Sequence, residues 1–391
     1  FEDAKAKYPN IYTDENEQIN IIDNLCICHL IKNLEPFSFL GTGDDIKGTV
    51  YEIFLKATLR GEFDQYFTPR EIVEFMVKCA DPNIGDVVLD PACGSGSLLL
   101  TVQDEVPGGS NAGMVKFYGQ ELNTTTYNLA RMNLMMHGVS FQNMSLSNAD
   151  TLESDWPDGP DAKGIDHPRS FDAVVANPPY SAHWDNNESK LKDPRFKDYG
   201  KLAPKTKADY SFVLHGLYHL NDEGTMAIVL PHGVLFRGAA EGAIRQNLIE
   251  HPCGNRIYAI IGLPSNLFFG TGIPTIIMVL KKKRTTKDIF FIDASNDFEK
   301  GKNQNKLSVE NINKIIAAYR ERKDIPKYAH LASIEEIRQN EYNLNIPRYV
   351  DTTEEEEEID INKVRELLAQ DKKEIAELEA QIAEQFKLLG I

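Results

Sequence analysis

The chain has 391 residues, enough for one large domain with smaller appendages and a substantial buried core. Its apolar content of 42% and charged content of 26% are ordinary for a globular protein. No apolar run approaches the roughly 20 residues of a membrane span, and no secretory signal pattern is visible. Five cysteines, odd in number and scattered, argue against a disulfide framework. These features favour a cytoplasmic protein with no membrane partner. Because the chain opens at Phe1 rather than Met, we expect further residues upstream.

The formal net charge is −17. Part of this acidity is local, since the segment from Asp351 to Ile391 holds 13 acidic and 5 basic side chains. Affinity for nucleic-acid phosphates comes mainly from Lys and Arg, so the chain as a whole is not a general nucleic-acid binder. A nucleic-acid function would need either a local basic segment or a partner subunit that holds the polymer.

The first 60 residues have a helical pattern. A helical period of 3.6 residues runs through Ile19, Ile22, Leu25, His29 and Lys32/Asn33. A second helix is expected from Asp44 to Leu59. Cys26 and Cys28 lie beside His29, but no further ligands follow at zinc-like spacing, so we expect buried core thiols and no metal site. We assign residues 1–60 to a helical segment.

From Tyr66 onward, strands and helices alternate, which indicates βαβ units and a mostly parallel sheet. Seven apolar segments are expected as strands: Val87–Asp90, Lys116–Gln120, Phe171–Ala176, Met226–Leu230, Arg256–Ile261, Thr275–Leu280 and Ile289–Ile292. Four segments between them are expected as helices: Ser97–Asp104, Asn123–His137, Ala208–Leu220 and Glu241–Glu250. We therefore predict an α/β domain of Rossmann-like type over residues 61–350.

The first strand runs into a turn of small residues that opens a helix. After Asp90 come Pro91, Ala92, Cys93, Gly94, Ser95, Gly96 and Ser97. A strand, a small-residue turn and a helix N-terminus let a ligand approach the backbone closely. Asp90 can accept hydrogen bonds from a ligand amine or hydroxyl. Pro91 replaces the first glycine of a dinucleotide-binding loop, which disfavours NAD and FAD.

Two further acids follow strands. Glu121 ends the second strand, where an acid is placed to hold ribose hydroxyls. Asp150 follows a third strand-like segment, from which its carboxylate could reach an adenine amino group. Together with Asp90, these acids predict a nucleoside site at one edge of the sheet.

The strand Phe171–Ala176 delivers Asn177, Pro178, Pro179 and Tyr180 at its carboxyl end, where open α/β sheets place their chemistry. The Asn177 side-chain oxygen and the Pro178 carbonyl can each accept one N–H hydrogen bond. Such a pair suits an exocyclic aromatic amine, because it favours a tetrahedral nitrogen whose lone pair points at a methyl donor. The two prolines stiffen the turn, and Tyr180 offers a ring for stacking on a base.

A basic segment follows this turn. Between Trp184 and Lys207 its cationic side chains are Lys190, Lys192, Arg195, Lys197, Lys201, Lys205 and Lys207. They could hold phosphates near the site, or form an ordinary solvated loop.

Residues 351–391 form an acidic stretch and a helical tail. The apolar seam of the tail has heptad spacing and consists of Ile361, Val364, Leu368, Ile375, Leu378, Ile382 and Leu389. This pattern predicts either a partner-binding coiled-coil helix or a helix that folds back on its own domain.

The order of these motifs along the chain resembles that of the γ-class amino-methyltransferases of DNA. The motifs are Gln65-Tyr66-Phe67-Thr68-Pro69-Arg70, the turn from Asp90 to Ser97, Glu121, Asp150 and the turn from Asn177 to Tyr180. More closely, the chain resembles the modification subunit of type I restriction–modification systems. The resemblance covers roughly residues 45–350, and the acidic stretch and helical tail are also typical of that subunit. It implies a Rossmann-like S-adenosylmethionine-dependent methyltransferase sheet acting on the N6 amino group of adenine.

The resemblance also implies residue roles. Gln65 through Arg70 would contact the methionine part of S-adenosylmethionine, with Thr68 and Pro69 nearest its carboxylate. Ala92, Gly94, Ser95, Gly96 and Ser97 would line the cofactor turn. Asp90, Glu121 and Asp150 would complete the nucleoside site. Asn177, Pro178, Pro179 and Tyr180 would hold the target base, and Phe269, rather than Phe268, would face it after it leaves the duplex.

The implied partners are double-stranded DNA, a specificity subunit, a second copy of this subunit and a restriction subunit. A separate specificity subunit would account for the acidity of this chain. Three alternatives stay open: a protein-glutamine methyltransferase, an N4-cytosine methyltransferase, and a non-catalytic subunit that only binds the cofactor.

Overall fold

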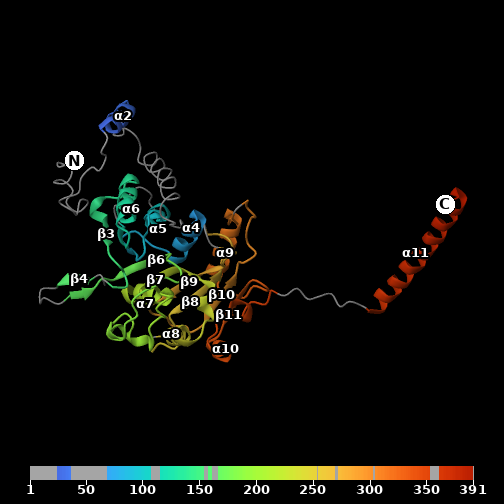
Figure 1. Ribbon diagram of the computed structural model, residues 1–391. Coiled ribbons are helices and arrows are strands. Elements are labelled where there is room, and N and C mark those ends of the chain that lie inside the picture. The colour runs from blue at the N-terminus through green and yellow to red at the C-terminus, as the bar shows by residue number, and fades with distance from the viewer. Residues whose placement is uncertain are drawn as a thin grey trace. The chain divides into compact units, whose positions relative to one another are not determined.

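The computed structural model describes residues 24–36, 68–106, 115–153, 157–160, 166–252, 254–268, 272–302, 304–352 and 361–390. The chain divides into two units, Phe1–Asp351 and Thr352–Ile391 (Figure 1). The expected helix Asp44–Leu59 lies outside the described residues, as do Gln65, Tyr66, Phe67 and Phe269.

The first unit is built on a sheet that has nine strands within the described residues. Their spatial order is β11 (Ala329–Ala332), β10 (Ile289–Asp293), β8 (Ile257–Gly262), β9 (Thr275–Lys281), β7 (Leu220–Pro231), β6 (Phe171–Ala176), β1 (Val87–Asp90), β2 (Lys116–Glu121) and β3 (Met144–Asn148). β9 runs antiparallel to both β7 and β8, and β11 runs antiparallel to β10. The other pairs are parallel, which confirms the predicted mostly parallel α/β sheet. Apart from it, β4 (Pro157–Pro160) pairs antiparallel with β5 (Asp166–Pro168).

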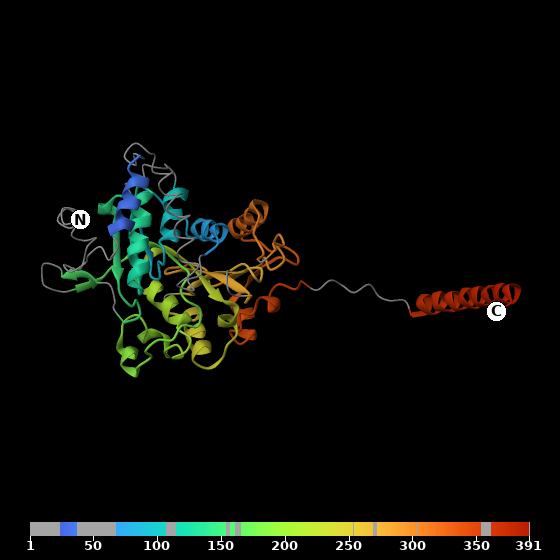
Figure 2. The same ribbon diagram turned by 45° about the horizontal axis from the view of Figure 1, so that its top comes forward.

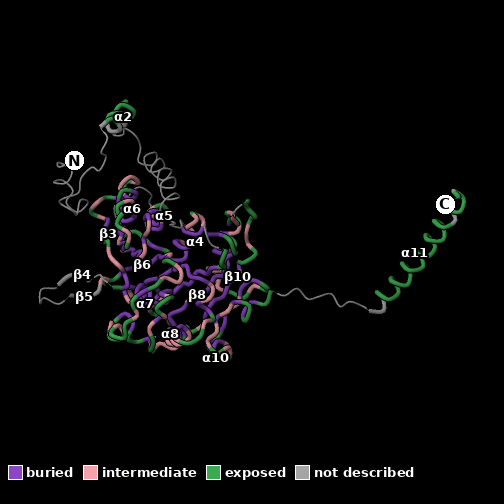
Figure 3. Tube along the Cα trace, viewed as in Figure 1, coloured by how far each residue is buried: buried purple, intermediate pink, exposed green. Residues whose placement is uncertain are grey.

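Helices cover both faces of the sheet, and Figures 1 and 2 show the two layers. One layer consists of α4 (Arg70–Ala80), α5 (Ser97–Glu105), α6 (Thr124–Met136) and α9 (Val309–Glu321). The other consists of α7 (Asp209–His219), α8 (Ala239–Ile249) and α10 (Ile334–Gln339). Successive strand residues point to opposite faces, so Val88 packs in the core under the first layer and Leu89 in the core under the second. Both cores are buried, as Figure 3 shows along the strands.

The predicted element bounds agree closely with the structure for β1, β6, α5 and α7. β7 begins at Leu220, earlier than the predicted Met226, because it follows α7 without a loop. The helices α4, α9 and α10 were not predicted. A capping box was available for α9, since the Ser308 hydroxyl accepts from the Asn311 backbone and the Asn311 side chain accepts from the Ser308 backbone.

Short 3₁₀ helices occupy several connections: η3 (Phe141–Asn143), η4 (Glu188–Lys192), η5 (Lys197–Tyr199), η6 (His232–Leu235) and η7 (Ile346–Arg348). Two of them, η4 and η5, lie in the segment between β6 and α7. That basic segment is therefore folded rather than an extended loop.

The helix α2 (Asn24–Leu34) falls in the predicted N-terminal helical segment. Cys28 on this helix is exposed, so the prediction of a buried core thiol is wrong there. A helical period identifies an apolar face but not what covers it, and Leu25 is also 78% exposed.

The second unit contains α11 (Ile361–Leu389), which confirms the predicted helical tail. All of its side chains that the structure describes are exposed (Figure 3). They include the seam residues Val364, Leu368, Ile375, Leu378 and Ile382. No helix among the described residues combines the length and the apolar character needed to cross a membrane.

Candidate active site

The carboxyl ends of β6, β1, β2 and β3 lie side by side at one edge of the sheet, because these strands are neighbours and parallel. A cavity of about 960 Å³ opens there. Its wall contains these predicted site residues: Thr68, Ala92, Gly94, Ser95, Ser97, Glu121, Asp150, Asn177, Pro178, Pro179 and Tyr180. Residues more than 100 positions apart in sequence thus share one cavity.

The small-residue turn after β1 has the conformation that its glycines allow. Gly94 and Gly96 have φ values of +53° and +80°, which side-chain-bearing residues rarely adopt. Gly96 lies at the N-terminus of α5, so the first backbone N–H groups of the helix are directed toward this end of the sheet. Gly96 itself is not on the cavity wall, whereas Ser95 and Ser97 are.

Asp90 lies behind the turn rather than on the wall. Its side chain is fully buried, and Oδ1 accepts a 3.1 Å hydrogen bond from the Ala92 backbone N–H. Oδ2 has no partner among the described residues. Burial raises the pKa of Asp90 to about 8, with the Ala92 N–H opposing and the charge of Glu121 adding to the shift.

Glu121 links the tip of β2 to the glycine turn. Oε2 accepts from the Gly94 backbone N–H at 3.0 Å, and Oε1 accepts from the Asn123 N–H at 2.8 Å. Partial burial raises the pKa of Glu121, against the effect of these backbone donors. Each oxygen keeps lone-pair capacity for a further donor, so the fixed carboxylate can accept two adjacent hydroxyls from the cavity.

Asp150 begins the turn after β3. Its Oδ1 accepts from the Leu152 backbone N–H at 2.9 Å, which fixes the carboxylate at the cavity wall. The next residue, Thr151, is buried, and its hydroxyl donates a 2.5 Å hydrogen bond to the Pro91 carbonyl. The Asp150 turn and the turn after β1 are therefore joined.

At the end of β6, the amide nitrogen of Asn177 donates a 2.7 Å hydrogen bond to the Thr68 hydroxyl. Its Oδ1 atom is buried and has no partner in the described part of the chain. An oriented amide with an unused acceptor suits a ligand that brings its own N–H donor.

The aromatic ring of Tyr180 packs edge to face on Phe268, with ring centroids 6.0 Å apart. Its burial raises the pKa of the Tyr180 hydroxyl, so the ring stays neutral. Behind the turn, Ser181 has a positive φ of 50°, and its N–H donates to Asp209 Oδ1 at 2.8 Å. The buried Asp209 is itself paired with the half-buried Arg237 at 3.1 Å, and this pair holds the turn.

The other predicted site residues are not on the cavity wall as the structure describes it. Gln65, Tyr66, Phe67 and Phe269 lie outside the described residues. Pro69 is the residue before α4 and is not on the cavity wall. The Arg70 side chain is 74% exposed and contacts Glu74 and Asp104 rather than the cavity.

Several wall residues were not predicted, notably Leu122, Phe212, Phe268 and Ile273. Leu122 is 69% exposed directly after Glu121, a position that sequence order alone could have suggested. Phe212 lies on α7, far along the chain from the strand ends, so no local sequence pattern predicted that it would reach the cavity. These side chains make the wall largely apolar around the acids.

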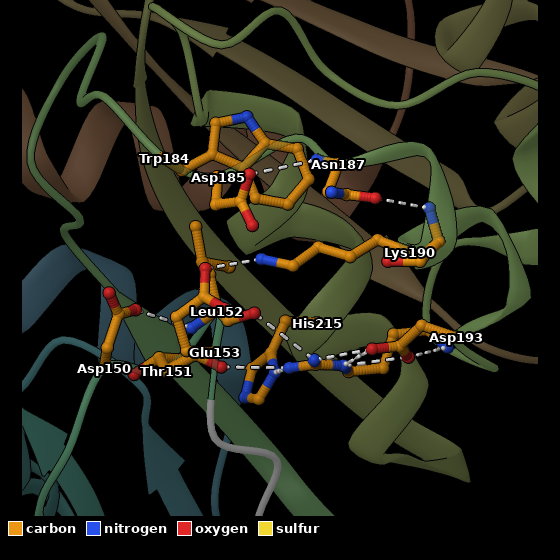
Figure 4. Close-up of polar contacts among 12 residues, drawn as sticks. Asp150, Thr151, Leu152, Glu153, Trp184, Asp185, Asn187, Lys190, Asp193 and His215 are labelled. Atoms are coloured by element: carbon orange, nitrogen blue, oxygen red, sulfur yellow. Dashed lines mark hydrogen bonds and ion pairs between the residues drawn. The ribbon is translucent and has the colours of Figure 1, made fainter.

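The basic segment differs from the sequence interpretation at two of its seven cationic residues. Arg195 is 2% exposed and Lys190 has only 13% of its side chain exposed, so neither is a freely solvated cation. Both face the Asp150 turn, and Figure 4 shows Lys190 reaching Glu153 there. Among the described side chains, no cluster of His, Cys, Asp or Glu could hold a metal ion.

Comparisons with known proteins agree on one family. The model of N-6 DNA methylases matches residues 42–358 of the chain. The type I restriction enzyme MpnII methylase subunit of Mycoplasma pneumoniae is 42% identical over an alignment of 340 residues that covers 85% of this chain. The chain spans 62% of the length of that relative, about three fifths.

Solved structures point to the same family. The crystal structure of a type I restriction–modification methyltransferase subunit from Streptococcus thermophilus is 45% identical, with a TM-score of 0.79 over 90% of this chain and 74% of that one. A Listeria monocytogenes protein described as a class I S-adenosylmethionine-dependent methyltransferase is 17% identical, with a TM-score of 0.56 over 80% of this chain and 88% of that one. This second likeness shows the fold alone. The chain belongs to the N-6 DNA methylase family and is related, within it, to the methylase subunits of type I restriction enzymes.

Proposed function

We propose that this chain transfers a methyl group from S-adenosylmethionine to the N6 amino group of adenine in a specific sequence of double-stranded DNA. It would do so as the modification subunit of a type I restriction–modification complex. The observation that carries the proposal is the amide of Asn177, whose Oδ1 atom is buried, unpartnered among the described residues and part of a residue on the cavity wall. The family relationship supports the same reaction.

The residues of the cavity fit the cofactor. Glu121 offers fixed acceptors for the two ribose hydroxyls, and Asp150 offers one for the adenine amino group. The turn from Ala92 to Ser97 and the hydroxyl-bearing Thr68 would surround the remaining part, with Leu122 and Phe212 adding apolar contact. When bound, S-adenosylmethionine supplies an electrophilic methyl group on its sulfonium sulfur.

The catalytic turn would orient the target amine. The N6 lone pair of adenine is delocalised into the ring, which makes the amine a poor nucleophile. Asn177 Oδ1 and the Pro178 carbonyl would each accept one N–H, leaving the lone pair directed at the methyl group. Tyr180 would stack on the base, which must leave the duplex at a cost of roughly a few kcal/mol. Phe269 is proposed to face the base from the other side.

Partners would supply what this acidic chain lacks. A net charge of −17 gives little general affinity for DNA phosphates, so a specificity subunit would read the sequence and hold the duplex. The exposed lysines of the basic segment, Lys192, Lys197, Lys201 and Lys205, would add local phosphate contacts beside the cavity. A second copy of this chain and a restriction subunit are proposed to complete the assembly.

The experiment is base-resolved methylation mapping of host DNA that carries the intact gene, the Asn177→Ala variant or the Asn187→Ala variant, with the partner subunits expressed. We expect N6-methyladenine in one sequence motif to disappear with Asn177→Ala and to remain with Asn187→Ala, whose side chain is exposed. The purified wild-type and variant chains should bind S-adenosylmethionine with affinities that agree within about threefold.

Other outcomes would favour the alternatives. A methylated cytosine in the motif would assign the reaction to N4 of that base. Unchanged DNA with a methylated glutamine in a protein would assign a protein substrate. Unchanged methylation in Asn177→Ala would remove Asn177 from the mechanism and support a cofactor-binding role without catalysis.

A further inference from the structure

Arg195 lies in the folded segment between the proposed catalytic turn (Asn177 to Tyr180) and α7, yet it is only 2% exposed. A buried guanidinium requires several hydrogen-bond acceptors, because its charge is costly to remove from water. Its acceptors therefore reveal which parts of the molecule it holds together.

The first acceptor is Asp193 of the same segment. Arg195 Nε donates to Asp193 Oδ1 at 3.0 Å, and Nη2 donates to Oδ2 at 2.7 Å. This planar, two-point pair fixes the guanidinium within its own segment.

The second set of acceptors belongs to the Asp150 turn. Arg195 Nη1 donates to the Thr151 carbonyl at 2.9 Å, and Nη2 donates to the Leu152 carbonyl at 3.4 Å. The third acceptor is Nδ1 of the buried His215 on α7, 3.1 Å from Nη1. Since a guanidinium only donates, this ring nitrogen accepts.

Figure 4 shows that these partners converge from three elements. Thr151 and Leu152 lie on the turn after β3, Asp193 lies on the segment after the catalytic turn, and His215 lies on α7. A second tie runs beside them, since Lys190 reaches Glu153 at 2.5 Å while its ammonium lies 5.0 Å from the centre of the Trp184 ring.

The carbonyls that Arg195 holds belong to residues that shape the cavity. Leu152 donates its N–H to the Asp150 carboxylate, and Thr151 donates its hydroxyl to Pro91 of the turn after β1. Displacing the Thr151 and Leu152 peptides would therefore move the Asp150 carboxylate and loosen the join between the two turns. Arg195 lies outside the cavity wall and can act only through these residues.

We propose that Arg195 is a positioning residue for cofactor binding, which holds the Asp150 turn in place from the segment that follows the catalytic turn. This inference rests on the proposed function, in which the Asp150 turn holds the adenine of S-adenosylmethionine. A consequence is that cofactor affinity depends on the folded state of residues 184–207, although these residues do not themselves contact the cofactor.

A lysine cannot replace this arginine. An ammonium is a compact point charge, whereas the planar guanidinium serves a carboxylate, two carbonyls and an imidazole in fixed directions. Arg195→Lys thus keeps the positive charge but removes the planar arrangement of hydrogen-bond donors. Lys197→Gln changes an exposed cation two residues away and serves as the matched control.

The experiment measures the affinity of the full chain for S-adenosylmethionine by titration calorimetry. We expect Arg195→Lys to weaken binding by at least about tenfold and Lys197→Gln to change it by less than about twofold. Asp193→Asn, which removes only the carboxylate partner, should weaken binding at least about threefold, and it keeps the test decisive if Arg195→Lys does not fold. Hydrogen exchange of the backbone amides of residues 150–153 should become faster in Arg195→Lys and in Asp193→Asn.

Steady-state kinetics separate positioning from a general loss of folded protein. Positioning predicts a higher KM for S-adenosylmethionine with kcat at saturating cofactor within about threefold of wild type. A lower kcat with unchanged KM would overturn the inference, as would unchanged affinity in the folded variants. If the wild-type chain itself bound no S-adenosylmethionine, the proposed function would fail instead.

Discussion

The amide nitrogen of Asn177 lies 2.7 Å from the hydroxyl oxygen of Thr68, a residue 109 positions earlier in the chain. Thr68 stands two residues before α4, and Asn177 directly follows β6, so the hydrogen bond joins the segment before the sheet to the turn from Asn177 to Tyr180. Because Nδ2 donates to Thr68, the amide oxygen is left as the acceptor for a ligand. The proposed role of Asn177 thus depends on a residue assigned from the sequence only to the cofactor.

Replacing Thr68 by valine should reduce catalysis. Valine has the shape of threonine but cannot accept the hydrogen bond, so the Asn177 amide loses its orientation and can turn its nitrogen toward the substrate. We expect kcat for methyl transfer to fall at least about tenfold, equivalent to about 1.4 kcal/mol of transition-state stabilisation. Steady-state methylation of an oligonucleotide duplex by the assembled complex measures kcat.

Thr275→Val is the matched control for this variant. Thr275 is also buried, but its hydroxyl has no hydrogen-bond partner among the described residues and it is not on the cavity wall. Removing an unsatisfied hydroxyl should leave kcat unchanged and the stability equal or slightly higher. Equal methylation rates in Thr68→Val and wild type would contradict the orienting role of Thr68.

The local motifs of the site could be predicted from the sequence because each is short and follows its own strand. The turn after Asp90 and the turn from Asn177 to Tyr180 are of this kind, and parallel neighbouring strands bring them to the same edge. Contacts that depend on tertiary packing could not be predicted. Phe212 reaches the cavity from a helix. Arg195 is buried within a segment whose composition fits either a phosphate-binding strip or a solvated loop.

The raised pKa of Asp90 predicts a pH dependence of stability. Burial raises this pKa from the ordinary value of 3.8 to about 8, so between these values the folded chain holds a proton that the unfolded chain has released. The stabilisation that Asp90 contributes is therefore complete below pH 3.8 and is lost as the pH rises through about 8. Asp90→Asn, which cannot ionise, should remove this loss.

Thermal unfolding of the chain without cofactor at pH 5 and pH 8.5 tests this prediction. The fall in Tm between the two should be larger in wild type than in Asp90→Asn. Asp222→Asn changes an exposed carboxylate and should keep the wild-type difference. Parallel Tm profiles for Asp90→Asn and wild type would show that the Asp90 carboxyl is not protonated in the folded chain at pH 5 to 8.

Phe268 and Phe269 are adjacent but should respond differently to truncation. Phe268 is 3% exposed and packs against the ring of Tyr180, so Phe268→Ala should lower the free energy of unfolding by about 3–5 kcal/mol. Phe269 is proposed to contact the target base, so Phe269→Ala should lower the free energy of unfolding by less than about 1 kcal/mol and reduce methylation. Denaturant unfolding and kcat/KM for DNA measure the two effects, and a large loss of stability in Phe269→Ala would assign that ring to the core instead.

The helix α11 offers a prediction about assembly. The described members of its heptad seam are exposed, with Leu368 at 52% and Ile375 at 55%. An amphipathic helix of 29 residues gains most of its stability from burying such a face, which favours a partner helix. If the seam binds the specificity subunit, Leu368→Ala and Ile375→Ala should each cost about 2 kcal/mol or more of binding energy, roughly a 30-fold loss of affinity.

Deleting residues 361–391 should abolish co-purification with the partner while leaving affinity for S-adenosylmethionine unchanged, because the cavity lies entirely in the first unit. The paired variant Glu366→Ala and Lys373→Ala is the control, since these residues occupy the heptad position opposite the seam and their joint removal keeps the net charge. It should bind the partner as wild type does. Co-purification that survived the deletion would exclude α11 as the principal contact and would direct attention to the exposed surfaces of the first unit.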